Sequence, residues 1–222
     1  IYLDKIRKNN ESIEAFMGKR VHEVLEWLYQ IDDLKNQYIV FDKLLNKYNE
    51  LWNEKSHKNI FIARCKYNKN SYNKNTLYKI GAECLKNYYS RFNKNGYFKE
   101  KVVAVEKEFQ IKIGNYLFKG FIDRIDQTSD GFFEIIDYKT SKKSKTYFQA
   151  KNDFQLAIYC LAVRELFTEY KKINLNLYYL RTNEIVHFEA DIDKISILKN
   201  KIIKRVLDIN NETNFIAKES LL

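Results

Sequence analysis

Two acidic residues and a lysine close neighbouring apolar runs near the middle of the chain. Asp137 and Lys139 end the run Phe132–Lys139, whose aromatic and β-branched residues are typical of a strand. Alternate residues of a strand share a face, so the two side chains are expected to point the same way. A second apolar run, which starts at Gly120, meets Asp123. The pattern predicts two strands that each bring a carboxylate to one place.

This combination of residues suits the hydrolysis of a phosphate ester. Two carboxylates at neighbouring strand ends fit a hard divalent cation such as Mg²⁺ or Mn²⁺, which prefers oxygen ligands. Such a cation lowers the pKa of bound water and neutralises charge on a phosphate. Lys139 can hold or polarise a water or a phosphate oxygen. An isolated Asp-x-Lys is equally typical of a solvated ion pair, so the neighbouring motifs must decide between the two.

The surrounding sequence predicts the elements that position these residues. Periodicity predicts helices over 11–29, 34–52, 77–92, 148–170 and 192–209, and strands over 102–113, 120–123, 132–139, 175–180 and 185–189. Ser12 is expected to cap the first helix. The first three strands are expected to form an antiparallel meander. The irregular segment 53–76 interleaves basic and aromatic residues, which suits either a grip on single-stranded nucleic acid or a solvated loop.

Four short motifs together resemble a known family. The segments 120–126 (GFIDRID), 136–140 (IDYKT) and 155–159 (QLAIY) resemble core motifs of the PD-(D/E)XK nuclease superfamily, in its RecB-like branch with the AddB and Cas4 nucleases. The segment 18–22 (GKRVH) resembles the Gly-x-x-x-His motif of that branch. All four occur in family order, and the resemblance spans about 16–163. It implies an α/β fold with a restriction-endonuclease-like core, a mixed β-sheet flanked by helices, and an N-terminal helical region.

The resemblance also implies a set of site residues. The implied catalytic residues are Asp123, Asp137, Lys139, His22, Gln155, Tyr159 and Glu106. The implied ligands of Mg²⁺ or Mn²⁺ are His22, Asp123, Asp137 and the carbonyl of Tyr138, and a nitrogen ligand fits Mn²⁺ better. Lys139 would orient or activate the attacking water, and Glu106 would support the site through a water.

Several of these residues also have an ordinary structural reading. Gln155 and Tyr159 share a helix face and would help place the substrate or the lysine, although Tyr159 could simply be core with Gln155 at its rim. His22 could be a satisfied surface histidine, but its spacing from Gly18 favours the site. Asp126 is assigned a structural role, because it lies three residues beyond Asp123 and is expected on the other strand face.

The charge balance points to a polyanionic partner. The 222 residues carry a formal net charge of +10, and nucleic acid is the commonest partner of such a basic chain. Lys142, Lys143 and Lys145 follow the Asp-x-Lys strand and are predicted to contact the phosphate backbone. A solvated loop explains the same lysines equally well.

Length and cysteine usage bound the organisation of the chain. Residues 1–222 fit one domain, with a mainly helical part (1–100) that carries the histidine motif and an α/β catalytic core (101–222). The chain starts at Ile1, so it is predicted to be a fragment of a longer protein. Three scattered cysteines form no Cys-x-x-Cys pair, which predicts a reducing, cytoplasmic location. Members of the branch that this chain resembles often hold an iron–sulfur cluster on flanking cysteines, and none of the three stands at such a position, so the resemblance implies no cluster in this chain. No apolar run is long enough for a membrane span.

Together these observations predict a metal-dependent DNA nuclease that hydrolyses phosphodiester bonds. We expect exonuclease-like action in DNA repair, recombination or defence, on single strands or duplex ends, with a helicase or another repair or defence protein as partner. The alternative is a non-catalytic nucleic-acid-binding or scaffold module that kept the fold. Retention of His22, Asp123, Asp137 and Lys139 argues against that alternative. The sequence does not exclude RNA as substrate.

Overall fold

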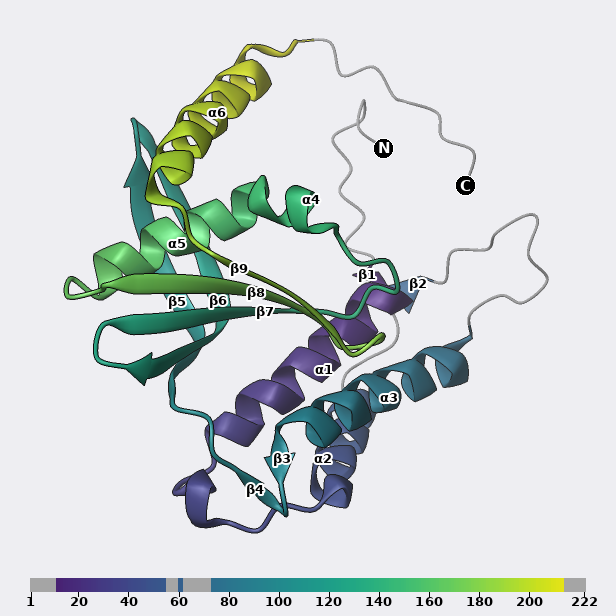
Figure 1. The fold of residues 1–222 in the computed structure, drawn as a ribbon. Coiled ribbons are helices and arrows are strands. Elements are labelled where there is room, and N and C mark those ends of the chain that lie inside the picture. Colours follow the sequence, from purple (N-terminus) through teal and green to yellow (C-terminus); the bar gives the residue numbers. More distant parts are fainter. Residues whose placement is uncertain (1–10, 55–59, 62–72, 214–222) are drawn as a thin grey trace. The chain divides into compact units, whose positions relative to one another are not determined.

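The computed structural model describes residues 11–54, 60–61 and 73–213, which divide into two compact units (Figure 1). The first contains the residues up to Lys99 together with Leu180–Asn183, and the second contains Glu100–Tyr179 and the residues from Glu184 onward. That the two units form a single domain stays a prediction, and most of the segment 53–76, including Cys65, lies outside the described residues.

The described residues of the first unit form three α-helices, a short 3₁₀ helix and two short strand pairs. The helices are α1 (Ile13–Tyr29), α2 (Phe41–Glu54) and α3 (Lys74–Phe92). The unpredicted strands are β1 (Glu11–Ser12) with β2 (Ile60–Phe61), and β3 (Asn93–Lys94) with β4 (Tyr97–Phe98). Ser12 caps α1 as predicted, because its hydroxyl accepts a 3.1 Å hydrogen bond from the Ala15 amide. The turn Leu180–Asn183 is tied to α3, where Asn87 donates to the Leu180 carbonyl at 2.9 Å.

The predicted second helix begins later than expected. The 34–52 periodicity covers a 3₁₀ turn, η1 (Leu34–Asn36), and an extended stretch before α2 starts at Phe41. Ile39 explains the break. Its amide donates to the Gly96 carbonyl at 2.7 Å, and its own carbonyl accepts from the Tyr89 hydroxyl at 2.9 Å. These long-range bonds satisfy the backbone outside a helix, and the apolar periodicity does not reveal them.

The second unit contains a five-stranded mixed sheet. In spatial order its strands are β5 (Val102–Ile113), β6 (Tyr116–Ser129), β7 (Phe132–Lys139), β8 (Lys172–Tyr179) and β9 (Glu184–Glu189). All neighbours are antiparallel except β7 and β8, which run parallel. The meander and the mixed sheet are therefore confirmed. The predicted strand 120–123 is the middle of the much longer β6.

The predicted long helix 148–170 is two helices. These are α4 (Tyr147–Lys151) and α5 (Phe154–Leu166). Asp153 separates them, because its carboxylate accepts from the Gln155 and Leu156 amides at 2.8 and 3.2 Å and so caps α5. Aspartate is a favoured N-cap because its oxygen satisfies amides that have no partner within the helix. The final helix, α6 (Ile192–Asn211), runs two residues past its predicted end.

The core of this unit lies between α5 and one face of the sheet. Its buried side chains include Phe109, Ile135, Leu175, Cys160 and Val163. The long β5–β6 hairpin continues beyond the rest of the sheet beside α6 (Figure 1), and Ile203 of α6 packs against the same cluster.

Both described cysteines, Cys84 and Cys160, are buried, and burial raises the pKa of each thiol to about 12. Both are therefore protonated, unreactive thiols at neutral pH. Among the described residues, no helix combines the length and apolarity that crossing a membrane requires.

Gly120 is required by the packing of this hairpin. A Cβ at this position would stand 2.8 Å from Cζ of Phe109, whose buried ring meets Tyr159 edge-on at 5.8 Å between centroids. We expect Gly120→Ala to lower the free energy of unfolding by about 1–3 kcal/mol, the usual cost of overpacking a core. Urea denaturation of this variant, alone and combined with Phe109→Leu, tests the cause. If Gly120→Ala lowered the free energy of unfolding equally with Phe109 present and in the Phe109→Leu background, the steric explanation would be contradicted.

Candidate active site

The candidate site lies where strands β6 and β7 part. Their ladder ends at the pair Arg124–Ile136, whereas β7 stays paired with β8 as far as Lys139. Asp123 and Asp137 occupy the next facing positions on the two strands. The Asp123 carboxylate fills the break in the ladder, because its Oδ2 accepts a hydrogen bond from the Tyr138 amide at 2.6 Å.

Glu106 stands opposite Asp123 on the other neighbouring strand. The pairs Val105–Arg124 and Lys107–Ile122 flank it in the register of β5 and β6. Its φ of 42° is in the left-handed region, where a non-glycine residue costs on the order of 1–3 kcal/mol. The regular alternation of β6 also slips here, since Ile122 and Ile125 both reach the same core although they are three residues apart. The site therefore sits at an irregularity in two adjacent strands.

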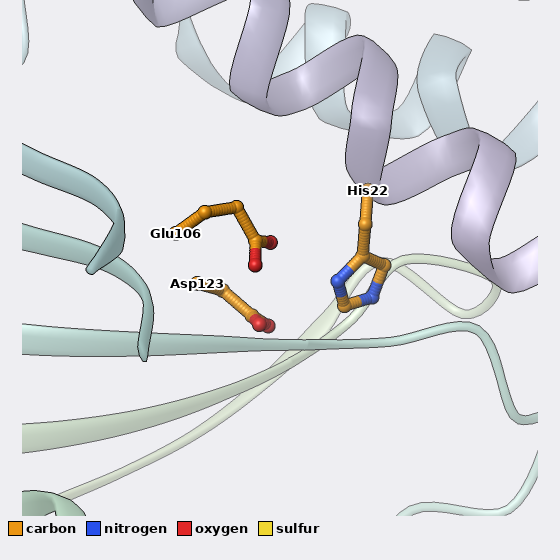
Figure 2. A group of neighbouring side chains, drawn as sticks. All are labelled: His22, Glu106 and Asp123. Carbon is orange, nitrogen blue, oxygen red and sulfur yellow. The ribbon is translucent and has the colours of Figure 1, made fainter. Parts of the chain in front are cut away.

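The two carboxylates converge. Oxygen atoms of Glu106 and Asp123 lie within 4.8 Å of each other, and Figure 2 shows both carboxylates turned toward a common point. Two like charges at this separation repel each other, and a hard divalent cation with oxygen ligands would relieve that repulsion. The pair therefore fits Mg²⁺ or Mn²⁺. Figure 2 also labels His22, which belongs to α1 of the first unit, and its role as a ligand stays a prediction.

A second chain of contacts runs from Asp137 to helix α5. The Lys139 ammonium lies 2.5 Å from Oδ2 of Asp137 and donates to Oε1 of Gln155 at 3.0 Å. The side-chain nitrogen of Gln155, Nε2, then donates to the Tyr159 hydroxyl at 2.9 Å. Asp137 is 1% exposed, whereas the Lys139 side chain is 29% exposed. The strand motif and the helix motif of the sequence thus form one connected group, with the lysine at its accessible side.

The electrostatics of Tyr159 connect the two halves of the site. Burial raises the pKa of its hydroxyl, and the charges of Asp137, Asp123 and Glu106 raise it further, while the hydrogen bond from Gln155 acts in the opposite direction. Three carboxylates therefore act on one hydroxyl. Tyr159 stays protonated at neutral pH and can donate its proton in a hydrogen bond.

The remaining predicted residues are placed less centrally. The backbone amide of Tyr138 is bound by Asp123, and its carbonyl as a metal ligand stays a prediction. Lys142 and Lys143 are exposed in the loop after β7. Lys145 forms an ion pair with Asp153. Burial alone would lower the pKa of Lys145, but the hydrogen bond and charge of Asp153 outweigh this effect, so the pKa is raised above its ordinary value. This lysine therefore also has a structural partner.

The sequence analysis predicted two further arrangements only incompletely. Asp153 caps α5 and holds Lys145, so it fixes the start of the helix that carries Gln155. Its position two residues before Gln155 is the signal that could have identified it as an N-cap. Asp126 forms a buried ion pair with Arg124, which is 1% exposed, consistent with the structural role expected for Asp126. An ion pair that is this buried contributes little net stability, so its main effect is to fix the geometry of β6 next to the break.

The hydrogen bond that Asp123 accepts can be tested apart from its charge. Asp123→Ala leaves the partly buried Tyr138 amide without this acceptor, which typically costs about 1–3 kcal/mol. Asp123→Asn keeps an oxygen acceptor and should lose less. Urea denaturation in EDTA compares the two, with Asp130→Ala as a surface control expected to change stability by less than about 0.5 kcal/mol. Equal stability of the Asp123→Ala and Asp123→Asn variants would contradict a structural role for this bond.

Comparison with known proteins identifies the family of this chain. A family model described as the PD-(D/E)XK nuclease superfamily matches residues 1–220. A stretch of 70 residues is 40% identical to a component of the ATP-dependent helicase/deoxyribonuclease of Streptococcus pyogenes serotype M49 (strain NZ131) and, equally, of serotype M1. These matches cover 30% of this chain, which spans only 6% of the length of those relatives.

A solved structure shows a weaker similarity. A crystal structure of a "Putative exonuclease" from Eubacterium rectale aligns with a TM-score of 0.49 and 13% sequence identity, and covers 95% of this chain and 72% of that one. The family model, in contrast, spans nearly the whole sequence and confirms the resemblance carried by the four motifs. The chain belongs to the PD-(D/E)XK nuclease superfamily.

Proposed function

We propose that this chain is a deoxyribonuclease that depends on Mg²⁺ or Mn²⁺ and hydrolyses phosphodiester bonds. The observation that carries the proposal is the arrangement within the second unit. The carboxylate pair Glu106 and Asp123 lies at the parting of the strands, with the Asp137–Lys139 ion pair on the strand beside it. Membership of a nuclease superfamily supports phosphodiester hydrolysis as the reaction.

The proposed cation site uses the carboxylates and two further donors. Asp123, Glu106 and Asp137 would hold the cation, with the Tyr138 carbonyl and the His22 imidazole completing the set. When bound, the cation would lower the pKa of a water and offset the negative charge of the phosphate. The nitrogen of His22 would favour Mn²⁺ over Mg²⁺, because imidazole is a softer ligand than carboxylate.

Lys139 is the proposed catalytic group beside that cation. Its ammonium is fixed between Asp137 and Gln155, so it can donate a hydrogen bond to the attacking water or to a phosphate oxygen without first losing much side-chain freedom. Gln155 positions it and also donates to Tyr159. The protonated Tyr159 hydroxyl can then donate toward the carboxylates whose charges it faces.

The DNA backbone is proposed to follow the loop after β7. Lys142 and Lys143 are exposed there and would contact phosphates directly. Lys145 would add positive charge to the loop while Asp153 holds it in place.

We propose exonuclease-like cleavage at single strands or duplex ends, in DNA repair, recombination or defence in the cytoplasm. A helicase is the proposed partner because the Streptococcus pyogenes relatives are named as parts of a helicase/deoxyribonuclease. The competing hypothesis is a scaffold that binds nucleic acid without cleaving it, and cleavage assays separate the two.

Metal binding is expected to depend on the converging carboxylates. Calorimetric titration with Mn²⁺ should show binding that Asp123→Asn or Glu106→Gln weakens by about tenfold or more, because each removes a charged oxygen ligand. His22→Ala should weaken Mn²⁺ more than Mg²⁺. Asp130→Asn is the matched control, since Asp130 is an exposed aspartate paired with Lys171. Equal Mn²⁺ affinity in the Asp123, Glu106 and control variants would rule out this site.

Lys139→Ala separates catalysis from metal binding. We expect cleavage of end-labelled DNA to fall by about 10²–10⁴-fold while Mn²⁺ affinity is retained, because an electrostatic or acid–base group is lost but the ligands remain. Asp137→Ala should lose activity and metal affinity together. Lys171→Ala, which removes an exposed lysine from a surface ion pair, is the control.

The same assay tests the substrate class. Single- and double-stranded DNA and RNA are incubated with Mg²⁺ or Mn²⁺, and melting temperatures are recorded for each variant. Undiminished cleavage by Lys139→Ala would refute the assigned role. A wild-type chain that binds DNA but cleaves no substrate with either metal would favour the scaffold.

A further inference from the structure

Helix α4 presents two large aromatic side chains to solvent. Phe148 is 75% exposed and Tyr147 is 54% exposed. The helix has only five residues, so these two rings make up much of its side-chain surface. A capping box between Thr146 and Gln149 fixes its first turn. Two adjacent exposed aromatic rings form a contiguous apolar surface, and such surfaces are candidate binding sites.

Each of these rings has a lysine beside it. The Lys194 ammonium of α6 lies 6.0 Å from the Phe148 ring centroid, and the Lys151 ammonium lies 4.9 Å from that of Tyr147. These distances are at or within the outer limit of a cation–π contact. Lys151 and Lys194 also line an apolar pocket whose wall includes Ala150, Ala157, Leu175, Phe188 and Leu198.

The acidic side chains of this pocket already have partners. Asp191 caps α6 by accepting from the Lys194 amide at 3.1 Å, and Glu189 pairs with Lys172 at 2.8 Å. Asp153 caps α5 and holds Lys145. The Lys151 ammonium also bonds the Tyr147 hydroxyl and lies in the field of Asp191, whereas the Lys194 ammonium stands over the Phe148 ring. Positive charge beside both rings favours an anionic ligand.

The surface is joined to the candidate active site by a short chain path. The loop after β7 begins at Thr140, directly after Lys139, and leads into α4 (Figure 1). Lys145 in that loop is bound to Asp153, and the first turn of α5 carries Gln155, which binds Lys139. The aromatic surface and the catalytic lysine are thus both anchored at the start of α5.

We propose that Tyr147, Phe148, Lys151 and Lys194 form a platform that binds single-stranded nucleic acid by stacking its bases and contacting its phosphates. Unpaired bases stack on aromatic rings without regard to sequence, and lysines beside the rings meet the backbone. A paired duplex hides its base faces, so the platform selects the single-stranded form. This inference rests on the proposed nuclease function and adds the form in which the substrate is held.

Binding is measured by fluorescence anisotropy in a Lys139→Ala background, which removes cleavage. The probes are a 20-nucleotide oligo(dT), a blunt 20-base-pair duplex, and a 20-residue abasic strand that keeps the phosphates but has no bases. Phe148→Ala should weaken oligo(dT) binding by roughly 5- to 100-fold, which corresponds to the loss of one stacked base. It should change binding of the duplex and of the abasic strand by less than about twofold.

A change to a lysine of the platform should give a different pattern from the loss of a ring. Lys194→Glu should weaken oligo(dT) and abasic-strand binding alike, because phosphate contacts do not need bases. Lys204→Glu is the matched control, since it lies ten residues further along α6, roughly 15 Å away at 1.5 Å per residue. Leu117→Ala, which truncates another exposed apolar side chain, controls for the loss of surface area.

A fluorescent variant gives a direct readout of stacking. Phe148→Trp should retain oligo(dT) affinity, and its added fluorescence should be quenched by oligo(dT) but not by the abasic strand. Equal effects of Phe148→Ala on all three probes, or no effect on any, would overturn the platform. If the unmutated chain cleaves DNA while Phe148→Ala has no effect on binding, the platform alone fails. If the unmutated chain neither binds nor cleaves any nucleic acid, both the platform and the proposed function fail.

Discussion

The hydrogen bond from the Tyr138 amide to the Asp123 carboxylate is the contact on which the site depends. Strand β7 is held on one side by β8 up to Lys139, but it loses β6 after Ile136. A side-chain oxygen takes over at the break, so the two strands can separate without leaving a partly buried amide unsatisfied. The same carboxylate faces Glu106. One side chain thus opens the sheet and supplies part of the chemistry.

The rest of the second unit offsets the cost of that arrangement. Glu106 has a left-handed backbone, and its carboxylate stands close to another; such strain is characteristic of functional positions. The buried cluster between α5 and the sheet stabilises the unit against it. Helix α5 also fixes the neighbouring groups, because Gln155 in its first turn holds Lys139. Its N-cap Asp153 holds Lys145 in the loop that leads to α4, so the proposed cleavage site and the proposed platform share one anchor.

Local patterns in the sequence were sufficient to predict the features whose interactions lie within one element or between neighbouring residues. The bounds of β5 and β7, the Ser12 cap of α1 and the pairing of Asp137 with Lys139 all follow from alternation, capping chemistry or neighbouring residues. The four motifs were also sufficient to identify the superfamily. In each case the determining residues lie close together in the chain or form a recognisable pattern.

Tertiary structure alone decided the features that depend on distant partners. The late start of α2 depends on Ile39 bonding to Gly96, and the convergence of Glu106 on Asp123 depends on a backbone conformation that the sequence of β5 does not signal. The exposure of Tyr147 and Phe148 on α4 is likewise visible only in the folded chain. The physical reason is clearest for Ile39, and for Asp153, which divides one predicted helix into two. A hydrogen bond to a remote group, or to a cap that competes with helix continuation, outweighs a local preference worth a fraction of a kcal/mol per residue.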